Sequence, residues 1–376
     1  MLVVYALDAR SYGLLVLCSL LSTWAFAALL ERATARRFAL WALAAAATVW
    51  THYFGGFLVL AEVVVLLWLR PAARRATVAA TAAVAAALLP LAPLLREQTG
   101  DERAGFIAGS GLGGRLEQLA REFAMGPNVP RTWLEAAGLA LFAAGGLAGV
   151  AIAAPRAAAA WRRRGATASG ADPLPDGAAA LLGLLAIGLL VPLALAVSGL
   201  YDRLYMRNLL YLQPLCAGLA ALGLLRLRAL PLAAYLAVAF AAVVWVQADW
   251  RYQQTDWRDA LAAVRAGDAR AGSAAPVLAA TELGQPVVRL YLHAAEAAGP
   301  LRTRRAWLVV EPRRGPGRRE LAPVAPAPAD GPLAARFPSR RERTVDGFRV
   351  VELTAPAPVE LAPGAIPGAT LFAPGR

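Results

Sequence analysis

The chain of 376 residues contains no lysine and very few of the side chains that build disulfides or metal sites. Its two cysteines, Cys18 and Cys216, both lie inside apolar runs, so we expect small core side chains and not a disulfide framework. Only two histidines, His52 and His293, are present, which leaves almost no ligands for a clustered zinc site. We therefore expect neither a bound metal nor another cofactor.

Charged residues are also scarce, at 17% against 59% hydrophobic residues, and the mean hydropathy is +0.51. A helix needs about 20 apolar residues to cross roughly 30 Å of hydrocarbon. The sequence predicts a polytopic α-helical membrane protein with about eight helical segments, because apolar runs recur until residue 247. These runs lie at 12–30, 38–51, 53–69, 76–95, 134–154, 179–198, 207–225 and 230–247.

The second and third runs are too long to form one straight crossing, because a helix over 38–69 would measure about 48 Å at 1.5 Å per residue. The segment Thr-His-Tyr-Phe-Gly-Gly at 51–56 supplies a break between them. We expect two short helices that form a hairpin.

Arginines mark one side of this topology. The short loops 31–37, 70–75, 155–178 and 226–229 carry twelve arginines and fall on one side, whereas the opposite loop 97–133 mixes arginines with carboxylates. Positive loops stay in the cytoplasm. The sequence therefore predicts a multi-pass membrane protein, in contact with membrane lipid, whose arginine-rich loops face the cytoplasm. The net charge of +13 reflects topology, so we do not expect nucleic acid as a partner.

Composition divides the chain into a transmembrane domain at 1–247 and a polar tail at 248–376. The tail alternates helix-like and strand-like segments, which predicts a small α/β domain on the outer side of the membrane. Helices are expected at 257–266 and 285–293, and strands at 276–280, 306–311 and 347–353. Residues 312–341 are rich in Pro, Gly and Arg, which predicts a long disordered loop.

Three polar segments lie at the predicted outer ends of spans. Their candidate binding residues are Asp8, Arg10 and Tyr12, then His52 and Tyr53, then Arg203, Tyr205 and Arg207. Arginine suits a phosphate because its fork gives bidentate hydrogen bonds, and histidine binds a phosphate oxygen or transfers a proton near neutral pH. Each segment alone also fits a plainer interpretation, namely an interfacial anchor, a histidine beside an aromatic belt, and a salt-bridged loop.

The three segments together resemble bacterial family 39 glycosyltransferases. Tyr-Ala-Leu-Asp-Ala-Arg-Ser-Tyr at 5–12 resembles the signature Y-A-x-(E/D)-A-R-x-Y, and Thr-His-Tyr at 51–53 resembles the outer T-H-Y turn of that family. The segment 205–214 is similar to its R-Y-(L/I)...P stretch, with Asn208 in place of the tyrosine. Asp-Trp-Arg-Asp-Ala at 256–260 is similar to the D-W-R-x-A opening of its exported domain.

This family is related to protein mannosyltransferases and to the aminoarabinose transferase of lipid A, in superfamily C. The resemblance implies a superfamily C membrane fold in the bacterial inner (plasma) membrane, with a small exported α/β domain. It also implies transfer of a sugar, with inversion, from a polyprenyl-phosphate donor to a glycan, lipid or protein acceptor on the outer face. Arg10, Arg207 and His52 would stabilise the leaving phosphate, and Asp8 is a candidate for the general base.

The usual catalytic carboxylate of the family lies in an outer loop between the first two spans, and Met1 begins almost at the motif that follows this loop. We expect a missing upstream segment or, alternatively, a truncated and inactive paralogue. The rival class is a non-catalytic membrane subunit or a transporter. Glu62 is the ionisable residue deepest inside a span, and we expect its polar partner in the missing upstream helices.

Overall fold

The computed structural model describes residues 12–99, 107, 111–130, 132–163, 177–252, 256–281, 284–314, 321–322, 324 and 333–375. The chain forms two compact units. Unit 1 comprises Met1–Pro127 with Arg131–Ala242, and unit 2 comprises Asn128–Pro130 with Val243–Arg376. The division at 242 and 243 falls inside a long apolar helix, just before the composition of the chain becomes polar at 248.

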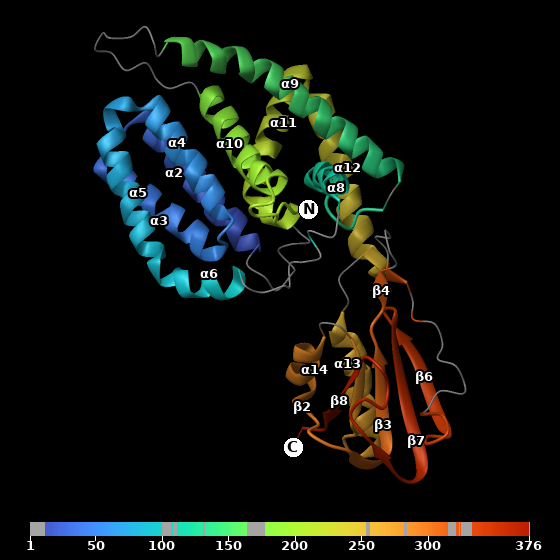
Figure 1. Ribbon diagram of the computed structural model, residues 1–376. Helices are drawn as coiled ribbons and strands as arrows, with labels where there is room; N and C mark the ends of the chain where they lie inside the picture. Colours follow the sequence, from blue (N-terminus) through green and yellow to red (C-terminus); the bar gives the residue numbers. More distant parts are fainter. Residues whose placement is uncertain are drawn as a thin grey trace. The chain divides into compact units, whose positions relative to one another are not determined.

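Unit 1 consists of helices, which Figure 1 colours from blue to yellow. Each predicted apolar run coincides with one helix or with helices that follow one another directly. The bounds are α2 Tyr12–Glu31, α3 Ala35–Thr51, α4 Gly55–Leu69, η1 Pro71–Ala73, α5 Arg74–Leu88, η2 Leu89–Leu91, α6 Ala92–Thr99, α8 Leu112–Ala124, α9 Trp133–Arg163, α10 Gly177–Val197, η4 Met206–Leu212, α11 Gln213–Leu227 and α12 Ala229–Ala248.

Among the described residues, six helices are long and apolar enough to cross a membrane. They are Tyr12–Glu31, Pro71–Glu97, Trp133–Arg162, Gly177–Val197, Met206–Leu227 and Ala229–Ala248. Several present large apolar side chains on the outside; on α12, Leu230 and Phe240 are 77% and 70% exposed. Such surfaces are unfavourable in water and suit hydrocarbon. The structure thus confirms a mainly helical chain with several apolar helices of spanning length.

The expected hairpin of short helices is also present. Helix α3 begins after Thr34, whose side chain accepts a hydrogen bond from the backbone N–H of Arg37, and it ends at Thr51. Helix α4 begins at Gly55, where a Cβ atom would lie 2.6 Å from the Thr48 side chain and 2.9 Å from the Thr48 carbonyl oxygen. Glycine therefore allows the two helices to meet closely at this turn.

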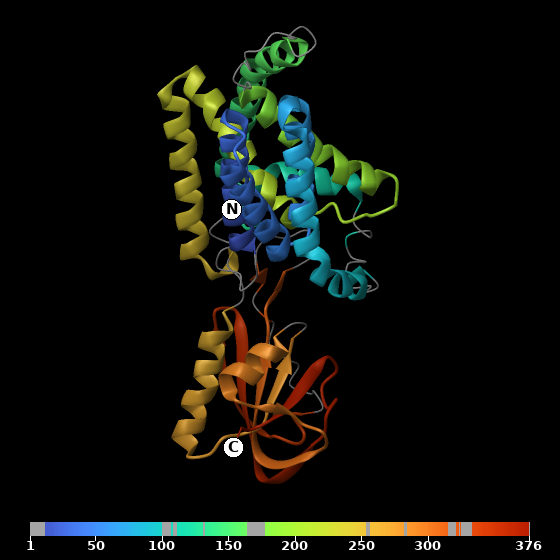
Figure 2. The same cartoon turned by 90° about the vertical axis from the view of Figure 1, so that its left-hand side faces the viewer.

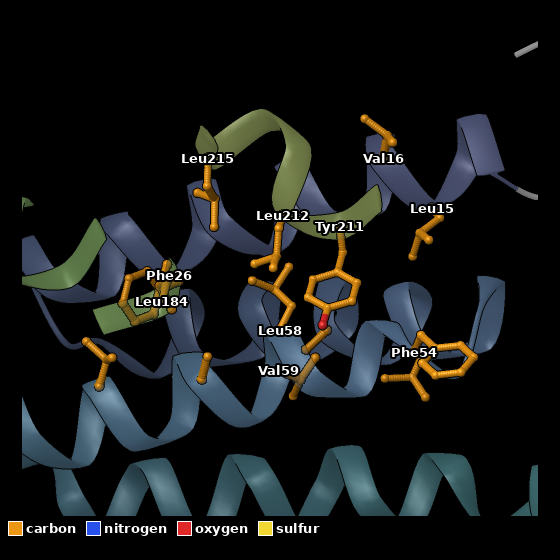
Figure 3. Packing of buried hydrophobic residues seen from close by; sticks show 14 of the residues in the cluster. Leu15, Val16, Phe26, Phe54, Leu58, Val59, Leu184, Tyr211, Leu212 and Leu215 are labelled. Carbon is orange, nitrogen blue, oxygen red and sulfur yellow. The ribbon is translucent and has the colours of Figure 1, made fainter. Parts of the chain in front are cut away.

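Large side chains from α2, α4, α10 and η4 fill the core of unit 1. Figure 3 shows the ring of Tyr211 reaching from η4 toward Leu58 and Val59 of α4, with Phe26 beside Leu184. The Tyr211 hydroxyl is buried and donates a hydrogen bond of 2.8 Å to the carbonyl oxygen of Gly188 in α10. The phenol thus fixes η4 against α10 without leaving a polar atom unpaired.

Small residues let α9 and α11 pack with their backbones in contact. A Cβ atom on Gly223 of α11 would collide with the carbonyl oxygen of Gly145 in α9, and one on Gly149 would collide with the carbonyl oxygen of Leu219. Two small residues spaced four apart on a helix allow this close approach between helices in a membrane.

The expectation that Glu62 finds its polar partner in upstream helices is wrong. Glu62 is fully buried in α4, where it accepts hydrogen bonds from Ser22 Oγ at 2.6 Å, from Trp41 Nε1 at 2.9 Å and from Thr23 Oγ1 at 3.5 Å. These donors lie on α2 and α3 of this same chain, so the buried carboxyl group is satisfied without upstream helices.

Unit 2 contains a six-stranded sheet in the order β2-β8-β1-β3-β7-β6. Strands β1 and β3 are parallel and the other pairs are antiparallel. Figure 2 shows α13 running along one face of this sheet. The bounds are η5 Trp250–Tyr252, α13 Trp257–Ala271, β1 Val277–Ala280, α14 Gln285–Leu292, β2 Ala295–Glu296, β3 Leu301–Val310, β6 Ser339–Val345, β7 Phe348–Leu361 and β8 Ala369–Ala373.

Each face of the sheet carries its own apolar core. Trp257, Leu261 and Val264 of α13 are buried with Val288 of α14 against one face. On the other face, Phe337 and its buried neighbours form a second cluster, which lines a pocket of about 380 Å³. Strands β1, β3, β7 and β8 are therefore covered on both sides, as expected for a small α/β domain.

The prediction of one disordered loop over 312–341 is wrong for the residues that the structure describes there. Strand β4 at Arg313–Arg314 pairs with β5 at Leu321–Ala322, and Leu333 and Phe337 are buried in the second core. Burying each of these two apolar side chains stabilises the fold by about 1.5–3 kcal/mol.

Candidate functional site

Residues from all three candidate segments meet at one end of the unit 1 helices. Tyr12 is the first residue of α2, His52 and Tyr53 lie in the turn between α3 and α4, and 201–205 form the connection from α10 to η4. We call Tyr12, His52, Tyr53, Tyr201, Arg203 and Arg207 the aromatic–arginine cluster. It is assembled by helix packing, since α2 packs against α4 and against η4.

The aromatic rings make the first set of contacts in the cluster. The ring centroid of His52 lies 5.6 Å from that of Tyr12 and 5.1 Å from that of Tyr53, with which it is stacked. Phe54 lies under this group, 4.6 Å from Tyr53 and 6.1 Å from Tyr201. These spacings are within the range in which aromatic pairs attract one another beyond simple burial.

The third segment joins this group through Tyr201, whose side chain is hydrogen-bonded to that of Tyr53. The guanidinium of Arg203 lies 5.8 Å above the ring of Tyr201, and that of Arg207 lies 5.3 Å above the ring of Tyr205. Cation–π contacts of this kind hold an arginine side chain in place beside an aromatic ring.

The surroundings of His52 keep its imidazole uncharged. Burial, together with the positive charge of Arg207, lowers the pKa of His52 to about 4. The imidazole is therefore neutral at pH 7. Its Nδ1 atom accepts a hydrogen bond of 3.4 Å from the backbone N–H of Phe54, which places the ring proton on Nε2. His52 thus offers an N–H donor, suited to a phosphate oxygen, and is a poor proton acceptor in this arrangement.

An ion pair that the sequence analysis missed holds the third segment. Arg115 of α8 is buried and donates to both carboxylate oxygens of Asp202, at 2.6 and 2.9 Å, and to the carbonyl oxygen of Leu204 at 3.1 Å. The hydrogen bonds from Arg115 hold the pKa of Asp202 below its usual value. The sequence analysis treated 97–133 as a loop, so neither α8 nor this pairing was predicted.

Asn208 supports the same segment from the other side. It is buried at the start of η4, and its Nδ2 atom donates a hydrogen bond of 2.9 Å to the carbonyl oxygen of Arg203. Asn208 is the residue that departs from the family-like pattern, and here it fixes the backbone that carries Arg203 and Tyr205.

Two proposed site residues, Asp8 and Arg10, lie outside the described residues. Asp202 is a carboxylate next to the cluster, and it is bound by Arg115. Across the described ranges, no group of three or more His, Cys, Asp or Glu side chains is placed to hold a metal ion.

The motif at 256–260 has a structural role in unit 2. The Asp256 side chain accepts a hydrogen bond of 2.9 Å from the backbone N–H of Arg258 and caps α13. Trp257 and Ala260 are buried against the sheet, and the Trp257 ring lies edge-on to Phe348 with centroids 4.8 Å apart. This motif therefore positions α13 within unit 2.

Comparisons of the chain with protein-family models, with curated proteins and with solved structures gave no match.

Proposed function

We propose that this chain is a glycosyltransferase that moves a sugar from a polyprenyl-phosphate donor to an acceptor hydroxyl. The observation that carries the proposal is the convergence of Tyr12, His52, Tyr53, Arg203 and Arg207 at one end of helices of spanning length. A lipid-linked donor keeps its chain in the membrane and its phosphate at the membrane boundary, where this cluster would meet it.

In the proposed reaction, the acceptor oxygen attacks the anomeric carbon of the sugar, and the bond from that carbon to the phosphate oxygen breaks. The phosphate leaves with the bonding electrons, so negative charge increases on its oxygens. Arg203 and Arg207 would stabilise this charge, and the Nε2–H of His52 would donate to one phosphate oxygen. The acceptor proton must pass to a base, for which Asp8 remains the proposed residue.

The aromatic rings fit the sugar part of such a donor. Tyr53 is 37% exposed while Phe54 beneath it is buried, so the cluster presents one phenol above a packed aromatic base. Phenol hydroxyls bind sugar hydroxyls, and ring faces pack on the apolar face of a pyranose.

Lysine substitution of Arg207 tests the proposal. Lysine keeps the charge and loses the bidentate fork, so Arg207→Lys should lower transfer from a polyprenyl-phosphate sugar by roughly tenfold or more. The matched control is Arg226→Lys. Arg226 is exposed and lies in the last turn of α11, at the opposite end of the continuous helix that η4 and α11 form. The assay follows release of polyprenyl phosphate from a panel of donors. Full activity of Arg207→Lys, or an equal loss in the control, contradicts the phosphate assignment.

A non-catalytic membrane subunit is the alternative function. Donor binding that depends on Arg207, without transfer to any acceptor, would favour that alternative.

We also propose that the chain resides in the bacterial inner membrane with unit 2 outside the cytoplasm. The support is the excess of arginine in the loops 31–37, 70–75, 155–178 and 226–229. A reporter active only in the periplasm should be active when fused after residue 376. A cytoplasmic reporter that fluoresces at this position would reverse the orientation.

A further inference from the structure

A second site lies at the other end of α2. A pocket of about 340 Å³ opens where α2 connects to α3, lined among others by Trp24, Arg32, Thr34, Arg36 and Leu40. Along α2, the lining residue nearest to Tyr12 is Trp24, and at 1.5 Å per residue the two are about 18 Å apart. The pocket is therefore distinct from the aromatic–arginine cluster.

Three arginines give this pocket its charge. Arg37 is already engaged, because its Nη1 donates to the carbonyl oxygens of Ala28 at 2.5 Å and Arg32 at 3.3 Å, and its Nη2 lies 3.7 Å from Glu31. The Arg32 and Arg36 side chains are exposed at the pocket. Arg37 thus holds the pocket wall in place and balances the negative charge of Glu31. Arg32 and Arg36 then leave the pocket with a net positive charge that attracts an anion.

The local backbone adds to this attraction. Helix α3 begins at Ala35 directly beside the pocket, and the positive end of its dipole favours an anion near Arg36. The Thr34 side chain already caps one N–H of this helix, that of Arg37. The helix end is therefore ordered before a ligand binds.

An apolar wall completes the pocket. Trp24 of α2 is 66% exposed and Leu40 of α3 is 43% exposed, and both line the pocket. An exposed tryptophan close to basic residues at a helix end is typical of the boundary between hydrocarbon and headgroups. The site combines two cations with an apolar surface at the end of α2, a helix that could span a membrane.

We propose that this pocket binds the headgroup of an anionic phospholipid, with its phosphate at Arg32 and Arg36 and an acyl chain along Trp24 and Leu40. Charge complementarity favours an anion, and the apolar wall favours a lipid over a soluble anion, which would use only the arginines. Basic pockets between spanning helices bind anionic headgroups in this way.

Native mass spectrometry of the purified full chain tests this site. The probes are phosphatidylglycerol and phosphatidylcholine with identical acyl chains. Arg32→Gln/Arg36→Gln should lower phosphatidylglycerol binding by at least about tenfold and leave phosphatidylcholine binding unchanged. The control is Arg74→Gln/Arg75→Gln, an exposed pair outside this pocket, which should stay within about twofold of the unchanged chain. An equal loss in both double variants, or no loss in the first, overturns the proposal.

Two further arms identify the source of the anion. Arg32→Lys/Arg36→Lys should retain most phosphatidylglycerol binding, since the attraction depends on charge, and this also shows that the pocket still folds after double substitution. Glycerol phosphate at equal concentration should not displace phosphatidylglycerol, and Trp24→Gln should weaken phosphatidylglycerol binding. Displacement by glycerol phosphate, or full binding by Trp24→Gln, would show a soluble-anion site and refute the lipid assignment.

Discussion

The ion pair between Arg115 and Asp202 allows a sharp test of how the candidate site is held. The two side chains form a bidentate pair, and Arg115 also binds the carbonyl oxygen of Leu204. The side chain of Arg115 is 6% exposed and that of Asp202 is 25% exposed. Replacing Arg115 with Met removes three hydrogen bonds and leaves a partly buried carboxylate without its cation.

The expected cost follows from this burial. Removing one partner of a fully buried pair costs about 3–5 kcal/mol. Because water still reaches a quarter of the Asp202 side chain, we expect Arg115→Met to lower the free energy of unfolding by about 2–3 kcal/mol. Asp202→Asn should cost less, and the double variant should cost less than the sum, with a coupling energy of about 1–2 kcal/mol.

Reversible unfolding of the purified chain by SDS in mixed micelles measures these values. The control is Glu117→Gln, which breaks the exposed contact from Glu117 to Arg121 on the same helix and should change stability by about 0.5 kcal/mol or less. Additive effects of Arg115→Met and Asp202→Asn would refute the reasoning. So would a control that is as destabilising as Arg115→Met.

Three further predictions concern unit 1. Lowering the pH from 6.5 to 4 should reduce the stability of the unchanged chain by up to about 3 kcal/mol more than it reduces the stability of the His52→Gln variant. The reason is that His52 in the unfolded chain binds a proton in this pH range, whereas the folded imidazole, with its pKa near 4, does not. An equal loss of thermal stability in both proteins contradicts this prediction. Glu62→Ala should destabilise by about 2 kcal/mol or more and Glu62→Gln by less, since glutamine still accepts hydrogen bonds from the buried donors; equal thermal shifts argue against a hydrogen-bonding role. Gly223→Ala should lower the free energy of unfolding by about 2 kcal/mol or more, because the added Cβ atom overlaps the backbone of α9. Gly218→Ala on the same helix meets no atom and should be neutral or stabilising. Unfolding curves of the two variants that coincide would contradict this prediction.

Hydrophobic run length predicted most of unit 1. The break at 51–56 was readable because His52 and the following glycines interrupt two apolar runs that are together too long for one crossing. Helix α8 was not predicted because it contains Gly113, Gly114 and a high proportion of charged residues. Its packing depends on burying Arg115, whose partners Asp202 and Leu204 lie far along the chain and are not part of the local pattern.

In unit 2, the sequence predicted β1, β3 and β7, but it predicted neither β8 nor the polar edge strand β6. Strand β6 is exposed from Ser339 through Thr344, so it lacks the alternation that reveals a strand. A usable signal was present in Asp346-Gly347, whose φ angles of 44° and 80° turn β6 into β7. An Asp-Gly dipeptide of this kind is a strong hairpin indicator.

For the candidate site, the sequence supplied the residues and the structure supplied their arrangement. Tyr12, His52, Tyr53, Arg203 and Arg207 were selected as separate segments, and spacing along the chain does not report that α2, the α3–α4 turn and η4 meet. Tyr201, Arg115 and Asn208 were missed as members or supports because their roles depend on contacts across 87 or more residues, or on a hydrogen bond to a backbone atom.

The hydrogen bonds of Glu62 also bear on the order in which the helices are made. All three donors, Ser22, Thr23 and Trp41, precede α4 in the chain. A charged side chain at the centre of a lone membrane helix costs about 2.5–3.5 kcal/mol on insertion. During synthesis α2 and α3 emerge first. Helix α4 can therefore leave the translocation channel into a membrane that already contains the hydrogen-bond donors of Glu62. A rearranged gene that places α4 ahead of α2 would keep every helix of the folded protein and still impair its biogenesis.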